Sequence, residues 1–469
     1  MKDKRKDLVN QIINFIFVVV ATLPFSFVWF NYYAGQMQTR FFRWGHLVML
    51  VLYVILYVTF GKIYGGFSLA TNRISSTLFS QALALLLCNG VMYLIMILIL
   101  RRYHVNIIPL GLAYLVQLVL LTVTTTICHK WYFFSFPPYR AAVIYDMRVG
   151  MEDLIRKYGL FKEFSVRKVM DIEKCLEDLS VLNDLDVVFL SGIHSHERNI
   201  VMKYCVANNM RCYVIPRVGD IMLSGAKRTH MFHLEILEVG PYDPPLYYTV
   251  IKRLSDILIA LVVLIVLSPL MLIVALAIKI QDKGPIFYRQ ERLTKDRKRF
   301  MLTKFRSMCV DAESDGIARL STGEGDERVT SVGRFIRRFR IDELPQLFSV
   351  LKGDMSICGP RPERPEIAEQ YEKELPEFSL RLQAKAGLTG YAQVYGKYNT
   401  PAYDKLLMDL AYISNPSLLY DIRLLFSTLK VLITPESTEG IERGHITADV
   451  AAKKRKRRKS EKTKAANKD

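Results

Sequence analysis

The first 128 residues alternate between long apolar runs and short polar connections. Most of these runs reach or approach the ~20 residues that a helix needs to cross the hydrocarbon core of a bilayer. This pattern predicts a four-helix transmembrane region over residues 1–130. The four runs are Leu8–Phe30, His46–Phe60, Thr77–Leu100 and Ile107–Cys128.

Residues 139–240 show a different pattern, in which short apolar segments alternate with amphipathic ones. Alternating strands and helices predict a small parallel sheet in a Rossmann-like α/β module. No G-x-G-x-x-G sequence follows the first strand, so a scaffold or regulatory role is favoured over dinucleotide binding. The predicted strands are Ala141–Tyr145, Asp186–Leu190 and Arg211–Ile215, and the helices lie near Glu152–Tyr158, Ile172–Leu179 and Glu197–Ala207.

A fifth long apolar run, Leu254–Ile280, contains Ser268 and Pro269 near its middle. A proline inside a helix removes a backbone hydrogen bond and kinks or breaks the helix. A broken helix can enter one leaflet and return to the same face, provided that its freed backbone groups are satisfied. The residues alone therefore leave two topologies open, a kinked fifth span and a re-entrant hairpin.

The formal net charge of +19 predicts anionic partners such as lipid headgroups or phosphates. Part of this charge lies in a polar, then strongly basic tail, residues 436–469, which is predicted to be disordered. The tail lacks interleaved aromatic residues and the chain has no recognised nucleic-acid motif, so no nucleic-acid partner is predicted. The four N-terminal runs hold almost no ionisable residues, which argues against an ion pathway.

The segment after the fifth run contains a basic strand pattern. In Phe300–Met308, Lys304 and Arg306 fall on one face of a strand and Phe305 falls on the other. Ile286–Arg292 is the predicted hairpin partner of this strand. Two cations on one face would suit a phosphate site, although a solvated strand face has the same pattern.

Residues Thr330–Arg340 predict an amphipathic helix. An apolar stripe runs beside clustered arginines, a pattern that suits a helix at a membrane surface, a helix facing polyanions, or a solvated basic face. The stripe consists of Val332, Phe335, Ile336 and Phe339, and the arginines are Arg334, Arg337, Arg338 and Arg340.

Asp342 and Glu343 stand at the start of the next predicted helix. Asp342 could simply cap that helix. The alternative is catalytic, because the N–H groups of a helix N-terminus attract phosphate and a carboxylate there can attack phosphorus. Glu343 could hold Mg²⁺, which favours carboxylate and phosphate oxygens. Further along, the prolines on both sides of Arg361 fix a turn that aims its guanidinium, which can contact a phosphate at two points.

Together these segments resemble the bacterial sugar transferases known as monotopic polyprenyl-phosphate phosphoglycosyl transferases. The matching stretch runs from Tyr248 to Ile433, with its motifs in an order specific to that family. The four preceding runs and the α/β module are similar to the long form, the initiating enzymes of capsule and exopolysaccharide synthesis. The motifs are FYRQER, KFRSM, TSVGRFIRR, DELPQL, LKGDMS, GPRPE and GLTGYAQVYG.

The resemblance implies an α+β catalytic domain over residues 248–435, with a re-entrant hairpin over residues 254–280 that is broken at Ser268 and Pro269. It implies that Asp342 attacks the sugar-bearing phosphate of a UDP-sugar and expels UMP, and that undecaprenyl phosphate then takes the phosphosugar from the aspartate. Glu343, with Asp342, is implied to bind Mg²⁺. The residues implied to contact phosphate or substrate are Lys304, Arg306, Arg337, Arg361 and Gln393.

The hairpin topology would place the active site and the UDP-sugar on the cytoplasmic face of the bacterial inner membrane. Glucose and galactose are the leading expectations for the sugar, with an N-acetylated or diamino sugar as alternatives. The architecture is also compatible with a homodimer through the N-terminal spans. The main competing function is an inverting glycosyltransferase, which would release UDP instead of UMP.

Overall fold

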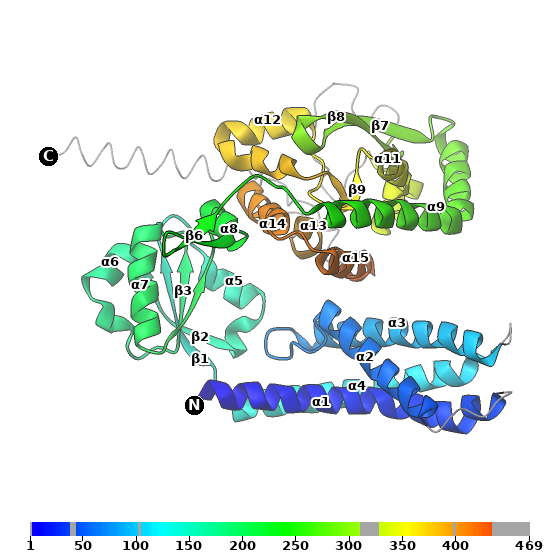
Figure 1. The fold of residues 1–469 in the computed structure, drawn as a ribbon, viewed down its shortest axis with the longest axis horizontal. Helices are drawn as coiled ribbons and strands as arrows, with labels where there is room; N and C mark the ends of the chain where they lie inside the picture. Colours follow the sequence, from blue (N-terminus) through cyan, green and yellow to red (C-terminus); the bar gives the residue numbers. More distant parts are fainter. Residues whose placement is uncertain (1, 38–43, 102–104, 310–327, 397–399, 434–469) are drawn as a thin grey trace. The chain divides into compact units, whose positions relative to one another are not determined.

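The structure is a computed structural model that describes residues 2–37, 44–101, 105–309, 328–396 and 400–433. The chain divides into two compact units, residues 1–215 and 216–469 (Figure 1). The predicted basic tail, residues 436–469, lies outside the described residues.

The first unit begins with four long helices that confirm the predicted apolar runs. Each is long and apolar enough to cross a membrane. Between the helices, Gln117 donates hydrogen bonds to the Ala21 carbonyl and the Tyr53 hydroxyl, both at 2.7 Å, so this buried amide is paired with the groups around it. The helices are α1 (Lys2–Val28), α2 (Gly45–Tyr64), α3 (Ile74–Leu100) and α4 (Ile108–Ser135), and short π- and 3₁₀-helical turns follow α1 (Trp29–Tyr33 and Ala34–Gln36).

The predicted parallel sheet follows the four helices and has the strand order β2-β1-β3-β4. Alternate side chains of its central strands enter two separate hydrophobic clusters, one against α6 and α7 and the other against α5. The sequence analysis missed β2, whose residues are mostly half-buried or exposed. The strands are β1 (Tyr139–Tyr145), β2 (Phe164–Asp171), β3 (Val187–Ser191) and β4 (Arg211–Val214), and the helices are α5 (Met151–Lys157), α6 (Ile172–Glu177) and α7 (Ser195–Ala207).

The second unit begins earlier in the chain than the predicted catalytic domain. Its first elements are α8 (Val218–Ser224) and the antiparallel pair β5 (Lys227–Met231) and β6 (Leu234–Glu238). Ile221 of α8 is buried in the main core of this unit. Residues 216–240, which the sequence analysis grouped with the α/β module, therefore belong to the second unit, because the burial of α8 depends on contacts with distant segments.

Helix α9 (Leu246–Asp282) continues through Ser268 and Pro269, where the family resemblance implied a break. Pro269 has no N–H to donate to the Ile265 carbonyl, and the Ser268 hydroxyl donates to that carbonyl at 2.8 Å instead. The ribbon of α9 nevertheless changes direction along its length (Figure 1). Both parts of the helix pack within the second unit, since Ala260 lies in the main core and Val274 in a second cluster with Phe305 and Ile336.

The rest of the second unit packs strands and short helices around one main core. The predicted hairpin is present, with β7 antiparallel to β8, and β9 pairs with β10 in parallel. The elements are β7 (Phe287–Leu293), β8 (Arg299–Phe305), α10 (Ser331–Arg338), a 3₁₀ helix (Ile341–Gln346), α11 (Leu347–Lys352), β9 (Ser356–Cys358), α12 (Pro365–Glu374), a second 3₁₀ helix (Pro376–Gln383), β10 (Gly387–Thr389), α13 (Tyr391–Tyr395), α14 (Ala402–Ser414) and α15 (Leu418–Ile433).

Candidate active site

Asp342 and Glu343 lie in the 3₁₀ helix between α10 and α11, and Asp342 is buried. Arg340, with a left-handed φ of 52°, separates this turn from α10. The alternative in which Asp342 caps the following α-helix does not hold, because α11 begins only at Leu347 and is preceded by Gln346. The carboxylate of Asp342 therefore does not serve as the N-cap of α11.

Three cations from different segments surround the carboxylate of Glu343. Arg361 Nη2 lies 3.1 Å and Lys304 Nζ 3.6 Å from its Oε1, and Arg340 Nη1 lies 3.8 Å from its Oε2. Burial raises the pKa of Glu343, but these cations outweigh burial and hold the pKa well below its usual range. Glu343 is therefore ionised at neutral pH.

The pKa of the neighbouring carboxyl group, that of Asp342, is shifted in the opposite direction. Burial, together with the negative charge of Glu343, raises the pKa of Asp342 to about 6, although Lys304, Arg337 and Arg340 act against this rise. Adjacent carboxyls whose environments move their pKa values apart are typical of sites that give the two groups different roles. The pair therefore combines a permanently charged group with one that titrates close to neutrality.

The structure gathers only some of the predicted site residues around this pair. Lys304 and Arg361 contact Glu343 directly, and Arg337 lowers the pKa of Asp342 while its Nε donates to the Ser307 hydroxyl at 2.7 Å. These three cations come from β8, from the loop after β9 and from α10. Distant parts of the second unit thus converge on one carboxylate pair.

Arg306 has a different position from the one expected from the strand pattern. It is buried in an ion pair with Asp282 at the end of α9, and Gly284 lies so close that a Cβ there would clash with the guanidinium. Because β8 ends at Phe305, the alternation that would place Arg306 beside Lys304 stops one residue too early. Arg306 thus joins the hairpin strands to α9.

Gln393 lies on α13, where its Nε2 donates to the Leu388 carbonyl at 3.2 Å. Its Oε1 is buried without a hydrogen-bond partner. Within the described part of the chain, no hydrogen bond or ion pair joins Gln393 to Asp342 or Glu343. Its predicted substrate contact remains a prediction.

Arg340 is a site residue that the sequence analysis assigned only to the basic face of a helix. Its left-handed backbone could not be read from the residue type, since such values of φ are uncommon outside glycine.

The predicted apolar stripe of α10 is also divided in the structure. Ile336 is fully buried, whereas Phe335 and the adjacent Phe339 are exposed.

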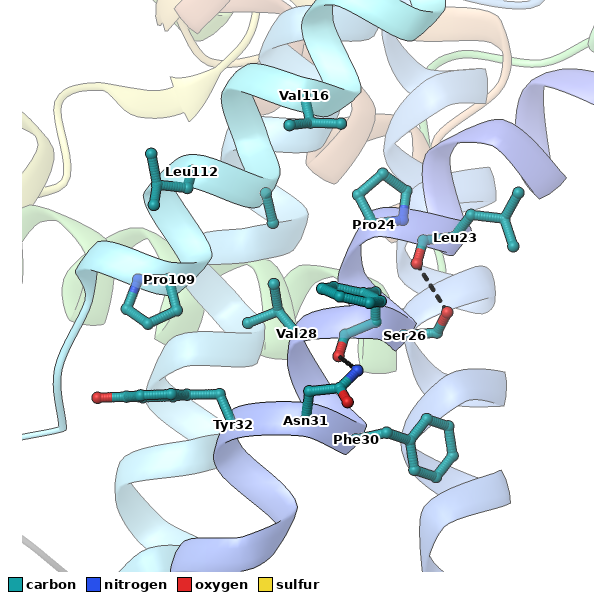
Figure 2. Close-up of a pocket in the computed structure, with 12 residues that line it drawn as sticks. Leu23, Pro24, Ser26, Val28, Phe30, Asn31, Tyr32, Pro109, Leu112 and Val116 are labelled. Atoms are coloured by element: carbon teal, nitrogen blue, oxygen red, sulfur yellow. Dashed lines mark hydrogen bonds between the residues drawn. The ribbon is translucent and has the colours of Figure 1, made fainter.

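A hollow of about 930 Å³ lies along α1 and α4 in the first unit (Figure 2). Its lining includes Leu23, Val28, Leu112 and Val116 and holds no side chain that is charged at neutral pH. Such a surface offers nothing to neutralise a nucleotide or phosphate, and in a membrane-crossing helix it suits lipid chains. Asp342 and Glu343 belong to the second unit and do not line this hollow.

Comparison with known proteins places the chain in a family. The model of the family described as "Bacterial sugar transferase" matches residues 247–435. A UDP-glucose:undecaprenyl-phosphate glucose-1-phosphate transferase of Caulobacter vibrioides is 38% identical over 191 residues, which are 40% of this chain and 71% of the relative. The chain therefore belongs to the bacterial sugar transferase family, and it is a membrane protein with several candidate spans.

Two further relatives are matched over a smaller share of their length. A UDP-N-acetylgalactosamine-undecaprenyl-phosphate N-acetylgalactosaminephosphotransferase of Aeromonas hydrophila is 39% identical over 233 residues, which are 49% of this chain and 54% of the relative. A UDP-glucose:undecaprenyl-phosphate glucose-1-phosphate transferase of Escherichia coli strain K12 is 40% identical over 220 residues, 45% of this chain and 47% of the relative. The chain thus spans about half the length of these curated relatives.

Proposed function

We propose that this protein transfers a sugar-1-phosphate from a UDP-sugar to undecaprenyl phosphate and releases UMP. The observation that carries the proposal is the buried Asp342, whose pKa is raised to about 6, beside an ionised Glu343 within a ring of cations. The named relatives, which act on UDP-sugars and undecaprenyl phosphate, support it.

The reaction proceeds in two displacements at phosphorus. A carboxylate oxygen of Asp342 forms a bond to the sugar-bearing phosphorus while the bond from that phosphorus to the UMP oxygen breaks. An oxygen of undecaprenyl phosphate then attacks the same phosphorus and frees the aspartate. Lys304, Arg337 and Arg361 are positioned to offset charge on the phosphates, since phosphoryl transfer depends mainly on positioning and electrostatic stabilisation.

The residues present fit the Mg²⁺ that the family implies. Mg²⁺ is commonly bound through one or two carboxylates, substrate phosphates and water, and it does not require a protein cage. Among the described residues no group of three or more His, Cys, Asp or Glu side chains could hold a metal, whereas Asp342 and Glu343 supply two adjacent carboxylates. Bound there with the donor, the ion would offset phosphate charge, and the raised pKa of Asp342 indicates that this position favours added positive charge.

The bend of α9 supports a re-entrant membrane topology. Tyr248 and Arg253 in its first part and Val274 and Ile278 in its second part all contact elements of the second unit. Side chains around the bend, including Ile265, are largely exposed and would lie in one leaflet. The helix would then enter and leave at the cytoplasmic face of the inner membrane, where the nucleotide sugar is available.

The decisive experiment measures nucleotide release by the purified protein with Mg²⁺, undecaprenyl phosphate and a panel of UDP-sugars. We expect UMP from the wild type and a loss of at least about 1,000-fold in Asp342→Asn, because the amide cannot form the covalent intermediate. Glu369→Gln, which neutralises an exposed carboxylate on α12, is the matched control and should keep full activity.

Trapping the covalent phosphosugar intermediate is a second part of the same experiment. Without acceptor, a donor labelled in its sugar-bearing phosphate should leave label on the denatured wild type and none on Asp342→Asn. Release of UDP would identify the competing glycosyltransferase reaction. Undiminished UMP release by Asp342→Asn would remove this residue as nucleophile.

The donor proposal is UDP-glucose or UDP-galactose. The glucose transferases among the relatives support the hexose class, and the Aeromonas hydrophila relative makes UDP-N-acetylgalactosamine the necessary competitor in the panel. UMP release with the acetylated donor alone would overturn the hexose assignment.

A further inference from the structure

The loop that carries Arg361 is held by its main chain at four successive carbonyl groups. The Pro360 carbonyl accepts from Gly387 N at 2.8 Å, and the Glu363 carbonyl accepts from Leu293 N at 3.0 Å. The two carbonyls between them are bound by arginine side chains. Arg381 Nη2 donates to the Arg361 carbonyl at 2.9 Å, and Arg292 Nη1 donates to the Pro362 carbonyl at 3.3 Å.

Arg381 is itself fixed in place on several sides. Its side chain is only 4% exposed, its Nη2 lies 2.6 Å from Asp409 Oδ2, and its Nη1 lies 3.5 Å from Glu363 Oε1. The guanidinium carbon also lies 4.9 Å from the centre of the Phe378 ring. A buried guanidinium with such partners has little freedom, because its planar fork must satisfy all of them in one orientation.

The arrangement connects a buried ion pair to the candidate catalytic centre. Asp409 on α14 orients Arg381, Arg381 holds the main chain of Arg361, and the Arg361 side chain reaches Glu343 at 3.1 Å. The ion-pair and hydrogen-bond partners of Arg381 among the described residues are Asp409, Glu363 and the Arg361 carbonyl, and the last two belong to the loop that carries Arg361, so its influence on Glu343 passes through that loop.

We propose that Arg381, oriented by Asp409, is a positioning residue that sets the guanidinium of Arg361 against Glu343 and the donor diphosphate. This inference rests on the proposed function for its kinetic consequences and on the geometry alone for its structural ones. The sequence motif GPRPE makes the turn rigid, and among the four donors that hold its carbonyls Arg381 is the one that binds the carbonyl of Arg361 itself.

The kinetic test is a double-mutant cycle on UMP release with Arg361→Met and Arg381→Lys. The lysine keeps a positive charge beside Asp409 and Glu363, so the protein should fold, but it lacks the fork that holds the Arg361 carbonyl. We expect Arg361→Met to lower kcat by about 100- to 1,000-fold, and Arg381→Lys to lower kcat by about tenfold or more. In the double variant Arg381→Lys should add less than about threefold, since its effect requires Arg361.

Arg299→Met, which removes an exposed arginine paired with Glu291 on β7, is the control and should behave as wild type. Effects that multiply in the double variant would overturn the proposal, because a residue with a general structural role acts independently of Arg361. The proposal would also be overturned if the activity lost in Arg381→Lys were fully explained by a smaller folded fraction, as judged from its lower melting temperature.

Hydrogen–deuterium exchange separates this inference from the proposed function, because it needs no substrate. In Arg381→Lys the amides of Gly359, Arg361, Glu363, Arg364 and Gly387 should exchange faster, while those of α10 are unchanged. Unaltered exchange in residues 359–364 would overturn the proposal even in an active enzyme. If the wild type released no UMP, the proposed function would fail and the exchange result would still decide whether Arg381 holds the loop.

Discussion

Two carboxyl groups that are adjacent in sequence acquire different chemistry from their surroundings. Glu343 faces Arg361, Lys304 and Arg340 at close range, whereas Asp342 is buried beside the charge of Glu343. The first stays ionised, and the second is costly to ionise. A nucleophile whose negative charge is poorly compensated in the free protein gains stabilisation when positive charge or a reacting phosphorus approaches it.

The raised pKa of Asp342 predicts an acidic limit to activity. In the proposed mechanism only the carboxylate attacks, so kcat/KM in the free enzyme should be constant above pH 7 and fall about tenfold per pH unit below the pKa of about 6. A pH profile of UMP release with subsaturating donor measures this limit. A profile that remains flat down to pH 4.5 would contradict the raised pKa.

The same shift predicts that Asp342 reduces the stability of the folded protein. Its pKa rises from about 3.9 in an unfolded chain to about 6 in the fold, so between these values the folded state binds more protons and stability falls as pH rises. Asp342→Asn should therefore be more stable than wild type by about 1 kcal/mol at pH 7.5, with a smaller difference near pH 4. Thermal melting in detergent at both pH values tests this, and an equal or lower melting temperature at pH 7.5 would contradict it.

At the scale of elements, the half-buried carboxylate of Asp421 holds the start of α9 in place. Asp421 on α15 accepts from the hydroxyls of Tyr248 and Tyr412 at 2.9 and 2.7 Å and pairs with Lys252 at 3.0 Å. These contacts join α9, α14 and α15. They lie next to β9, where the Cys358 thiol donates a hydrogen bond to the Asp421 carbonyl. The first part of the long apolar helix is thus attached to the unit that holds the candidate active site.

Replacing Asp421 with alanine should destabilise the second unit strongly. The substitution leaves Lys252 and two tyrosine hydroxyls half-buried or buried without this acceptor, a loss of about 3–5 kcal/mol for a broken buried pair. Melting in detergent should show the loss, whereas Glu369→Ala on the exposed face of α12 should change little. A melting temperature within one degree of wild type would show that the network contributes nothing.

At the scale of the whole molecule, the two units have separate hydrophobic cores. The family match, residues 247–435, lies entirely within the second unit. The Caulobacter vibrioides relative is matched over most of its length by a region of 191 residues. The four N-terminal helices and the α/β module therefore lie outside the family match.

This organisation predicts that residues 216–469 retain the chemistry. A chain of these residues, inserted in membrane or detergent, should release UMP within about tenfold of the full-length rate, because the candidate site residues and the core that packs them lie in the second unit. Release is compared at equal amounts of folded protein, judged by melting. A folded and membrane-inserted fragment without activity would show that the first unit completes the site.

Local features were predictable from the sequence because they depend on neighbouring residues. Apolar runs predicted α1 to α4, and alternation predicted the parallel sheet and the hairpin of β7 and β8. The boundary at residue 216 was not predictable, since the burial of Ile221 depends on α14 and other distant segments. The strand β2 was missed because it is only partly buried and its alternation of apolar and polar residues is weak.

The sequence by itself determined the candidate site residues, because the motifs around Lys304, Asp342, Glu343 and Arg361 are short and their residue types define what they can bind. Only the tertiary structure decided which charges meet. It places Arg340 beside Glu343, pairs Arg306 with Asp282 and holds the Arg361 loop with Arg381. The physical reason is distance along the chain: Coulombic and hydrogen-bond energies depend on separation in space, which periodicity and residue type specify only for near neighbours.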